Sequence, residues 1–178
     1  VDKVEELDGL PQANIEAAAK MAEANGQPGK YMFNMQRPSC NPVLQYCHNR
    51  ELREKVYNAY YNRGNAGNEY DNKEISRQIV TLRLKKANLM GYKNYAEMAL
   101  KDRMAKTPEA VYNLLDQVWE PAVKKAKEEL ADIRAEIKKE GKNFEPAGWD
   151  YMYYLDKAKK AKFAVDEAEI SKYLEINN

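Results

Sequence analysis

One stretch of the chain, from Thr107 to Gly141, constrains the fold more than any other. Thr107 can cap a helix that begins at Pro108, since proline suits the first helical position, and Gly141 is a typical helix stop. Between them, apolar residues recur at spacings of 4-3-4-3-4: Trp119, Val123, Ala126, Leu130, Ile133 and Ile137. This spacing predicts one long helix, over about residues 108–140, that buries its apolar stripe along another helix. We expect a kink near Pro121, because proline lacks the N–H of a helical hydrogen bond.

The rest of the sequence also has helical periodicity, interrupted by short turns. Helices are expected over about residues 11–25, 41–47, 52–63, 71–90, 148–163 and 167–174. Asn41 and Pro42 should begin the second of these, as a cap and a helix-initiating proline. The fourth carries two apolar stripes, one along Ile75, Ile79 and Leu82 and the other along Val80, Leu84 and Ala87. Two stripes predict a helix that is buried between neighbours.

The only strand candidate is Tyr31–Met35, which lies between Gly29 and Pro38. Because an isolated strand cannot satisfy its own backbone, its partner lies either within the N-terminal stretch or in another part of the protein. The predicted fold class is therefore all-α, a multi-helix array with one long kinked helix and at most one short β-strand, at about 31–35.

Composition and charge exclude several classes of function. The 178 residues are 44% hydrophobic, enough for a sizeable core, and 29 Lys and Arg balance 28 Asp and Glu to a net charge of +1. Because the two signs are interspersed, no basic tract is available to attract nucleic acid or a membrane surface. The apolar runs are far shorter than the roughly 20 residues of a membrane span. Two cysteines suit a reducing cytoplasm, which is the expected location.

The two ends of the chain suggest a piece of a larger protein. The chain opens at Val1 without an initiator methionine, and Glu175–Asn178 directly follows an apolar helical pattern. Apolar groups at such an end need cover. We therefore expect residues 1–178 to be a single helical fragment of a larger polypeptide.

Candidates for catalysis or metal binding are few. The single histidine, His48, follows Cys47, and Cys40 lies seven residues before Cys47. This spacing fits no common zinc site and lacks a fourth ligand, so we interpret Cys47 as a core residue and His48 as an exposed one. Tyrosine clusters at 57–61 and 151–154 are expected to pack, since tyrosine buries a large apolar ring. From the residues alone, no catalytic, cofactor-binding or metal-binding residue is assigned.

Several segments resemble, in order and nearly without gaps, the thimet-oligopeptidase family of zinc metallopeptidases. They are Asn41–Cys47, Arg50–Tyr57 with Ala59 and Arg63, Leu82–Tyr92, Met104–Pro108, Trp149–Asp150, Tyr153–Tyr154 and Leu174. The resemblance covers roughly residues 5–178. It implies an almost wholly helical, two-lobed parent protein with a deep channel between the lobes.

The resemblance also implies the chemistry of that parent. Zinc would be held by a His-Glu-x-x-His helix and a downstream glutamate, the metal would polarise the scissile carbonyl and activate a water, and the motif glutamate would act as general base. None of these residues has a counterpart in the 178, so no catalytic or metal residue is carried over, and zinc is expected in the parent only. The fragment would then be channel wall and scaffold. Its partners would be the missing catalytic lobe of the same polypeptide and short peptides.

Two branches of the family, and one other class, are alternatives. Residues 103–111 favour a peptidyl-dipeptidase, which releases C-terminal dipeptides, whereas Pro38–Ser39 and Tyr46–Cys47 are similar to oligopeptidase A, which cuts internal bonds. The other class is a stand-alone helical protein-interaction module with the long helix as its binding rod. If the chain is a channel wall, residues Trp149–Tyr154 and Tyr173–Leu174 should present an apolar face that the full protein covers.

Overall fold

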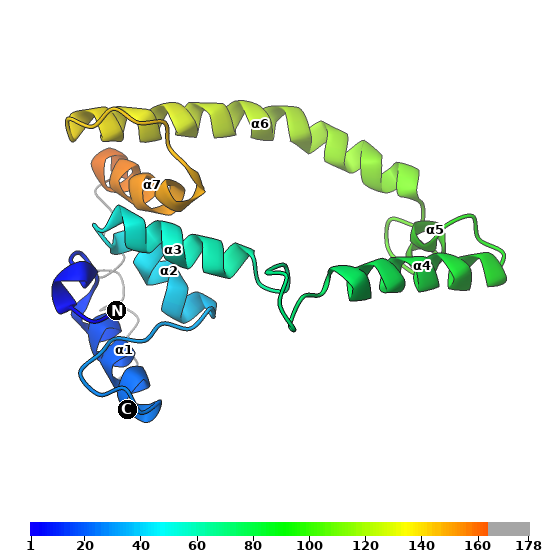
Figure 1. The fold of residues 1–178 in the computed structure, drawn as a ribbon. Helices are drawn as coiled ribbons and strands as arrows, with labels where there is room; N and C mark the ends of the chain where they lie inside the picture. The colour runs from blue at the N-terminus through cyan, green and yellow to red at the C-terminus, as the bar shows by residue number, and fades with distance from the viewer. Residues whose placement is uncertain (164–178) are drawn as a thin grey trace, which may run out of the picture. The chain divides into compact units, whose positions relative to one another are not determined.

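The computed structural model describes residues 1–163, which form seven α-helices and one short 3₁₀ helix (Figure 1). The elements are η1 (Val4–Leu7), α1 (Gln12–Ala24), α2 (Arg37–Tyr46), α3 (Arg50–Tyr61), α4 (Lys73–Leu89), α5 (Tyr95–Leu100), α6 (Pro108–Lys139) and α7 (Gly148–Phe163). The all-α prediction is confirmed. Over the described range, no helix is long and apolar enough to cross a membrane. The helix expected at 167–174 lies outside the described residues.

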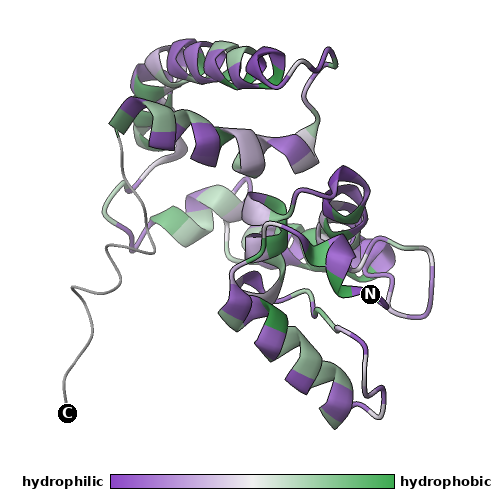
Figure 2. Ribbon diagram, turned by 90° about the vertical axis from the view of Figure 1, so that its left-hand side faces the viewer, coloured by the Kyte–Doolittle hydropathy of each residue, from purple (hydrophilic) through white to green (hydrophobic). Residues whose placement is uncertain are grey.

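The chain forms two compact units, which are described separately. Unit 1 contains Val1–Tyr61 and the chain from Glu129 onward, and unit 2 contains Asn62–Glu128. The long helix α6 begins in unit 2, ends in unit 1 and runs unbroken through Pro121. The kink expected there stays a prediction. Hydrophobic and hydrophilic residues alternate along the helices in Figure 2, as is typical of amphipathic segments.

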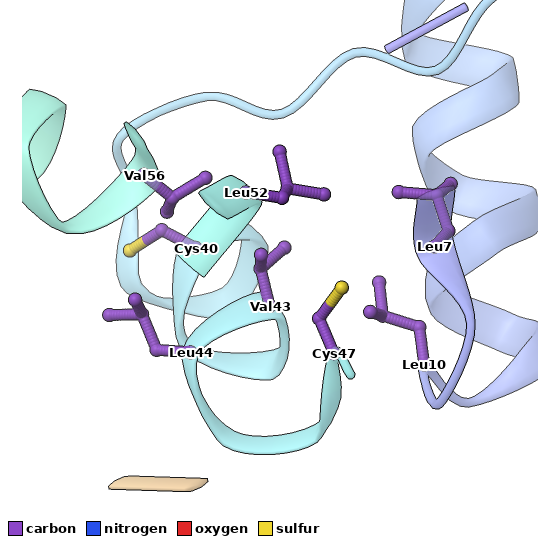
Figure 3. Close-up of a cluster of buried hydrophobic side chains, with 8 residues drawn as sticks. All are labelled: Leu7, Leu10, Cys40, Val43, Leu44, Cys47, Leu52 and Val56. Atoms are coloured by element: carbon purple, nitrogen blue, oxygen red, sulfur yellow. The ribbon is translucent and has the colours of Figure 1, made fainter. Parts of the chain in front are cut away.

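Unit 1 has a core built from three segments of the sequence. Eight buried side chains meet in it: Leu7, Leu10, Cys40, Val43, Leu44, Cys47, Leu52 and Val56. Figure 3 shows them converging from η1 and the residue soon after it, from α2 and its C-terminal end, and from α3. Burial of apolar surface contributes about 25 cal/mol per Å², and this is the main force that holds the three segments together.

A second, smaller core in unit 1 joins the end of α6 to α7. It consists of Ile133 and Ile137 from α6 and Tyr153 and Tyr154 from α7. The two helices lie side by side in Figure 1. The C-terminal part of the stripe predicted along α6 is thus buried. The N-terminal part is not, because Trp119 is 69% exposed and Ala126 is also exposed, while Val123 and Leu130 are half-buried.

Unit 2 contains α4, α5 and the first part of α6, and Ala87 is the single buried residue among residues 62–128. Local polar bonds organise its turns: the Asn94 side chain accepts from the Glu97 N–H at 2.9 Å, and Asp71 accepts from the Lys73 N–H at 3.0 Å. The large apolar residues of α4 are exposed: Ile75, Ile79, Val80, Leu82, Leu84 and Leu89. The prediction that this helix is buried between neighbours is therefore wrong for the described chain. The two stripes exist in the sequence, but their side chains, Ala87 excepted, are exposed.

The start of α2 differs from its prediction. The helix begins at Arg37, so Pro38 lies in its first turn and Pro42 lies inside it. The carbonyl of Gln36 starts the helix by accepting from the Cys40 N–H at 3.0 Å, which is one turn earlier than expected. A proline early in a helix costs little, because the N–H groups of the first turn have no helical partner.

The strand expected at Tyr31–Met35 does not form. Its backbone is nevertheless bonded, as the Tyr31 N–H donates to the Val1 carbonyl at 2.9 Å and the Val1 amino group donates to the Tyr31 carbonyl at 2.8 Å. The Met32 N–H donates to the carbonyl of Ala18 at 3.0 Å. The partner therefore lies within the N-terminal stretch, but the pairing is too short to make a sheet. Tyr31 and Phe33 pack against the core of unit 1 instead.

Candidate functional site

The most unusual polar feature of unit 1 is a buried ion cluster formed by Arg50, Arg53 and Asp150. The side chains of Arg53 and Asp150 are 2% and 0% exposed. Arg50 donates to the Asp150 carboxylate from Nε at 3.0 Å and from Nη2 at 2.7 Å, and Arg53 Nη2 donates to it at 3.0 Å. Such two-pronged arginine–carboxylate contacts are strong and fix the relative orientation of both groups.

Arg53 and Asp150, the two buried members of the ion cluster, make further hydrogen bonds. Arg53 donates from Nη1 to the Cys47 carbonyl at 2.8 Å and from Nε to the Trp149 carbonyl at 3.2 Å. Asp150 also accepts from the Ala147 N–H at 3.0 Å, in the first turn of α7. A buried charge is tolerated when it is paired and hydrogen-bonded in this way. The cluster therefore ties α3 to the start of α7, about a hundred residues further along the chain.

The guanidinium group of each arginine lies over an aromatic ring. The Arg50 guanidinium lies 4.4 Å from the centre of the Phe144 ring, and that of Arg53 lies 4.1 Å from the centre of the Tyr153 ring. Burial by itself raises the pKa of Asp150, but the hydrogen bonds from Arg50, Ala147 and Arg53 outweigh it and lower that pKa below its ordinary value. The carboxylate is thus held in its charged form. This is the electrostatics of a structural ion pair rather than of a general acid.

The residues considered for metal binding do not come together. Cys40 and Cys47 are reduced thiols buried in the core, and the Cys47 Sγ donates to the Glu6 carbonyl at 3.4 Å. Burial raises the pKa of Cys47, which disfavours the thiolate that a metal needs. His48 is exposed, and its Nδ1 lies 2.9 Å from the Asp8 carboxylate. Residues 1–163 contain no group of three or more His, Cys, Asp or Glu side chains placed to hold a metal.

A groove of about 420 Å³ opens in unit 1 beside the N-terminal end of α7. Its walls include Tyr57, Tyr61, Leu130, Tyr151 and Met152, so they are apolar with tyrosine hydroxyls at intervals. The Tyr151 hydroxyl donates to Glu129 at 3.2 Å. Such a surface suits an apolar side chain of a ligand.

The loop before α6 adopts a strained conformation in unit 2. Met104 is 99% exposed, and Lys106 is the one non-glycine residue of the described chain with a positive φ, at 63°. Thr107 caps α6 as predicted, because its hydroxyl accepts from the Ala110 N–H at 3.2 Å. A left-handed non-glycine residue costs roughly 1 kcal/mol, so the loop is held in place by the structure around it.

Comparison with known proteins finds clear relatives. Peptidase family M3 matches residues 43–178. Oligopeptidase A of Haemophilus influenzae is 36% identical over 182 residues, which cover 99% of this chain and 26% of that protein. Dipeptidyl carboxypeptidase of Escherichia coli is 32% identical, with 99% and 26% covered, and the probable cytosolic oligopeptidase A of Arabidopsis thaliana is 32% identical, with 96% and 25% covered. The chain thus spans about a quarter of the length of these relatives.

The fold and the ion cluster define the class first: an all-helical chain in which an arginine–carboxylate cluster joins distant parts of the sequence. The family follows from the comparison. The chain belongs to peptidase family M3, and the resemblance on which that prediction was based is confirmed.

The residues of the ion cluster lie in segments that resemble the family, but they were not predicted from the sequence to have a role. A signal was available in α3, where Arg53 lies three positions before Val56 and four before Tyr57, on the same apolar face. A charged residue on such a face needs a buried partner of opposite charge. Nothing in the sequence identified Asp150 as that partner, since the two are 97 residues apart.

Proposed function

We propose that this chain is a wall and scaffold segment of a zinc-dependent M3 peptidase that cleaves short peptides. The observation that carries the proposal is the match to family M3 over residues 43–178, in relatives named oligopeptidase A and dipeptidyl carboxypeptidase. The 178 residues hold a single histidine and no His-Glu-x-x-His. The zinc ligands and the general base therefore come from the remaining polypeptide.

The role of the segment in the parent is to position rather than to react. Catalysis depends on holding a substrate in a narrow range of geometries, and a displaced wall loses that advantage. The ion cluster of Arg50, Arg53 and Asp150 supports this role, because it fixes α3 and α7 to each other. The isolated chain is expected to be inactive and to hold no zinc with the affinity of a catalytic site.

The branch of the family is the finer part of the proposal. Residues 103–111 favour release of C-terminal dipeptides, as in a peptidyl-dipeptidase. Identity does not add to that preference, since the oligopeptidase A of Haemophilus influenzae is 36% identical and the dipeptidyl carboxypeptidase of Escherichia coli 32%. Cleavage of internal bonds is therefore the alternative. We place the parent in the cytoplasm, in line with the relative named as probable cytosolic; the alternative is an organelle, as in the relative named organellar.

The test uses the intact parent reading frame, loaded with zinc, and a panel of free-ended and C-terminally blocked peptides of about five to fifteen residues, a size that a narrow channel admits. Chelator-sensitive release of dipeptides from free C-termini only is the expected result. Internal cleavage of blocked peptides as well would assign the oligopeptidase branch. No cleavage of any peptide by the folded, zinc-loaded parent would overturn the peptidase proposal in favour of a helical interaction module.

A second measurement tests the isolated chain directly. After dialysis against zinc and then against buffer, the 178-residue chain should retain no stoichiometric zinc, since Cys40 and Cys47 are buried and residues 1–163 contain no group of three His, Cys, Asp or Glu that could hold a metal. Retention that disappears when Cys40, Cys47 and His48 are replaced together would contradict this expectation.

A further inference from the structure

Most of the exposed large apolar side chains of the described residues lie in unit 2. On α6 they are Tyr112, Leu114, Leu115, Val118 and Trp119, each between 54% and 69% exposed, and on α4 they include Ile75, Ile79 and Leu82, between 44% and 62%. We call these two sets the open faces of α6 and α4. Contiguous exposed apolar surface of this kind marks an interface rather than a solvated surface.

The open face of α6 follows the helix geometry. Three of its five residues, Leu115, Val118 and Trp119, are spaced i, i+3 and i+4, which places them on one side at 3.6 residues per turn. No charged residue interrupts that side, whereas Asp116, Glu120 and Lys124 fall on the other. A face without charges resembles the core of a permanent interface, since transient interfaces are more polar.

The helix expected to dock provides little of this surface. Residues Trp149–Tyr154 were predicted to form the apolar face that the full protein covers, but Tyr153 is 5% exposed and Tyr154 is fully buried within unit 1, and Tyr151 alone of the six is exposed, at 41%. The other part of that prediction, Tyr173–Leu174, lies outside the described residues. Uncovered apolar surface is instead concentrated in unit 2.

We propose that the open faces of α6 and α4 are the docking surface for the part of the parent polypeptide that lies outside these 178 residues. The occupant is inferred from length: relatives that match this chain almost end to end are about four times longer, so most of such a protein is available to cover these faces. The inference rests on the proposed function, because it takes the parent to be a full-length M3 protein. Beyond that function, the inference identifies the surface of this chain that the rest of the protein covers.

Cysteine accessibility tests the proposal without an activity assay. Leu115→Cys and Leu82→Cys probe the open faces, and Glu120→Cys and Lys85→Cys are matched controls at exposed polar positions of the same helices. Each variant is labelled with a maleimide in the isolated 178-residue chain and in the intact parent. The native Cys40 and Cys47 are fully buried and add little background.

Docking predicts that both Leu-site cysteines react about 100-fold or more slowly in the parent than in the isolated chain, because labelling then requires local opening, while the controls react equally in both. Equal rates at both Leu sites would overturn the proposal, and protection on one helix only would overturn the claim for the other. If labelling of the isolated chain becomes slower as its concentration rises, the open faces bind a second copy of the chain and the proposal is overturned. Far-UV circular dichroism verifies that each variant is folded.

The peptidase assay on the same parent separates the two proposals. A parent that cleaves peptides but labels at both open faces would overturn the docking surface alone. A parent that is protected at both but cleaves nothing would overturn the proposed function and leave the docking surface standing.

Discussion

The two units of this chain are built from the same kind of amphipathic helix, yet unit 1 buries many of its apolar side chains and unit 2 leaves most of its own exposed. Unit 1 buries two hydrophobic clusters and a charged pair, Arg53 and Asp150, that is nearly inaccessible to solvent. Unit 2 buries Ala87 alone among its residues, and leaves Trp119 and Leu82 more than half exposed. The apolar faces of the unit 1 helices pack against one another, whereas the apolar faces of α4 and of the first part of α6 do not.

The two units differ in the interactions that stabilise the isolated chain. In unit 1, apolar burial and the ion cluster join segments that are far apart in sequence. A single substitution there is therefore expected to lower the free energy of unfolding of the whole unit. In unit 2, turns and caps are satisfied locally, for example by Asn94 and Asp71, and a single change meets few neighbours. Because the chain has two tryptophans, Trp149 in a Trp119→Phe background is a fluorescence reporter of unit 1.

The largest effect is expected from Asp150→Ala. Removing this carboxylate leaves the Arg53 guanidinium, which is 2% exposed, without its buried counter-charge. Breaking a buried ion pair on one side typically costs about 3–5 kcal/mol. Urea denaturation followed by Trp149 fluorescence should show that loss.

The matched control for this variant is Asp116→Ala, at an exposed position of α6 in unit 2, which should cost under roughly 0.5 kcal/mol. Similar losses for Asp150→Ala and Asp116→Ala would mean that the ion cluster does not hold unit 1 together.

The next largest effect is expected from Ile133→Ala. Ile133 is fully buried against α7, so its truncation removes transfer free energy and leaves a cavity, which together cost about 2–5 kcal/mol. Leu130→Ala should cost less, because Leu130 is half-buried at the edge of the groove. Leu115→Ala lies on the open face and should cost under roughly 0.5 kcal/mol in the isolated chain. An equal loss at Ile133 and Leu115 would show that α6 is covered along its whole length.

Sequence periodicity predicted most of the helices, though not η1 or α5, and it did not predict which of their faces are buried. The long helix was expected over about residues 108–140 and is found at Pro108–Lys139, because a threonine cap, a first-turn proline and a terminal glycine all act locally. The stripe along it could not be divided into buried and exposed halves from spacing, since Trp119 and Ile133 fit the same pattern. Burial depends on a partner, and the sequence of one helix does not contain its partner.

The ion cluster shows the same limit for the candidate site. Arg53 is a charge on an apolar helix face, which is a signal of a buried counter-charge that the sequence analysis did not use. Its partner, Asp150, lies 97 residues further along, and many carboxylates of the chain could have served as well. Only the packing of α3 against α7 selects that one.

A smaller effect is expected from Gly148→Ala, which tests how tightly unit 1 is filled. A Cβ at this position would lie 2.3 Å from the hydroxyl oxygen of Tyr57, closer than any real contact, so the ring or the helix must shift. Overpacking of this kind costs about 1–3 kcal/mol. The ring of Tyr57 is also held by Tyr61, whose ring centre is 4.3 Å away.

A double-mutant cycle checks the cause of that loss. In a Tyr57→Leu background the clash is relieved, so Gly148→Ala should cost less than it does alone. An unchanged cost in that background would show that the loss comes from the α7 backbone and not from the tyrosine.

The smallest effect is a pH dependence carried by Glu140 in unit 1. Burial opposes its charge, but hydrogen bonds from Lys142, Lys157 and Tyr154 outweigh burial and lower its pKa from 4.5 to about 2. Because the folded pKa is depressed, the stabilisation is fully present above pH 4.5 and is lost as the pH falls from there towards 2. Denaturation of the unchanged chain at successive pH values should therefore show a decline in this window that Glu140→Gln makes shallower. Glu145→Gln, whose carboxylate is 69% exposed and pairs with Arg134 in solvent, should change the decline less; the reverse order would contradict the assignment.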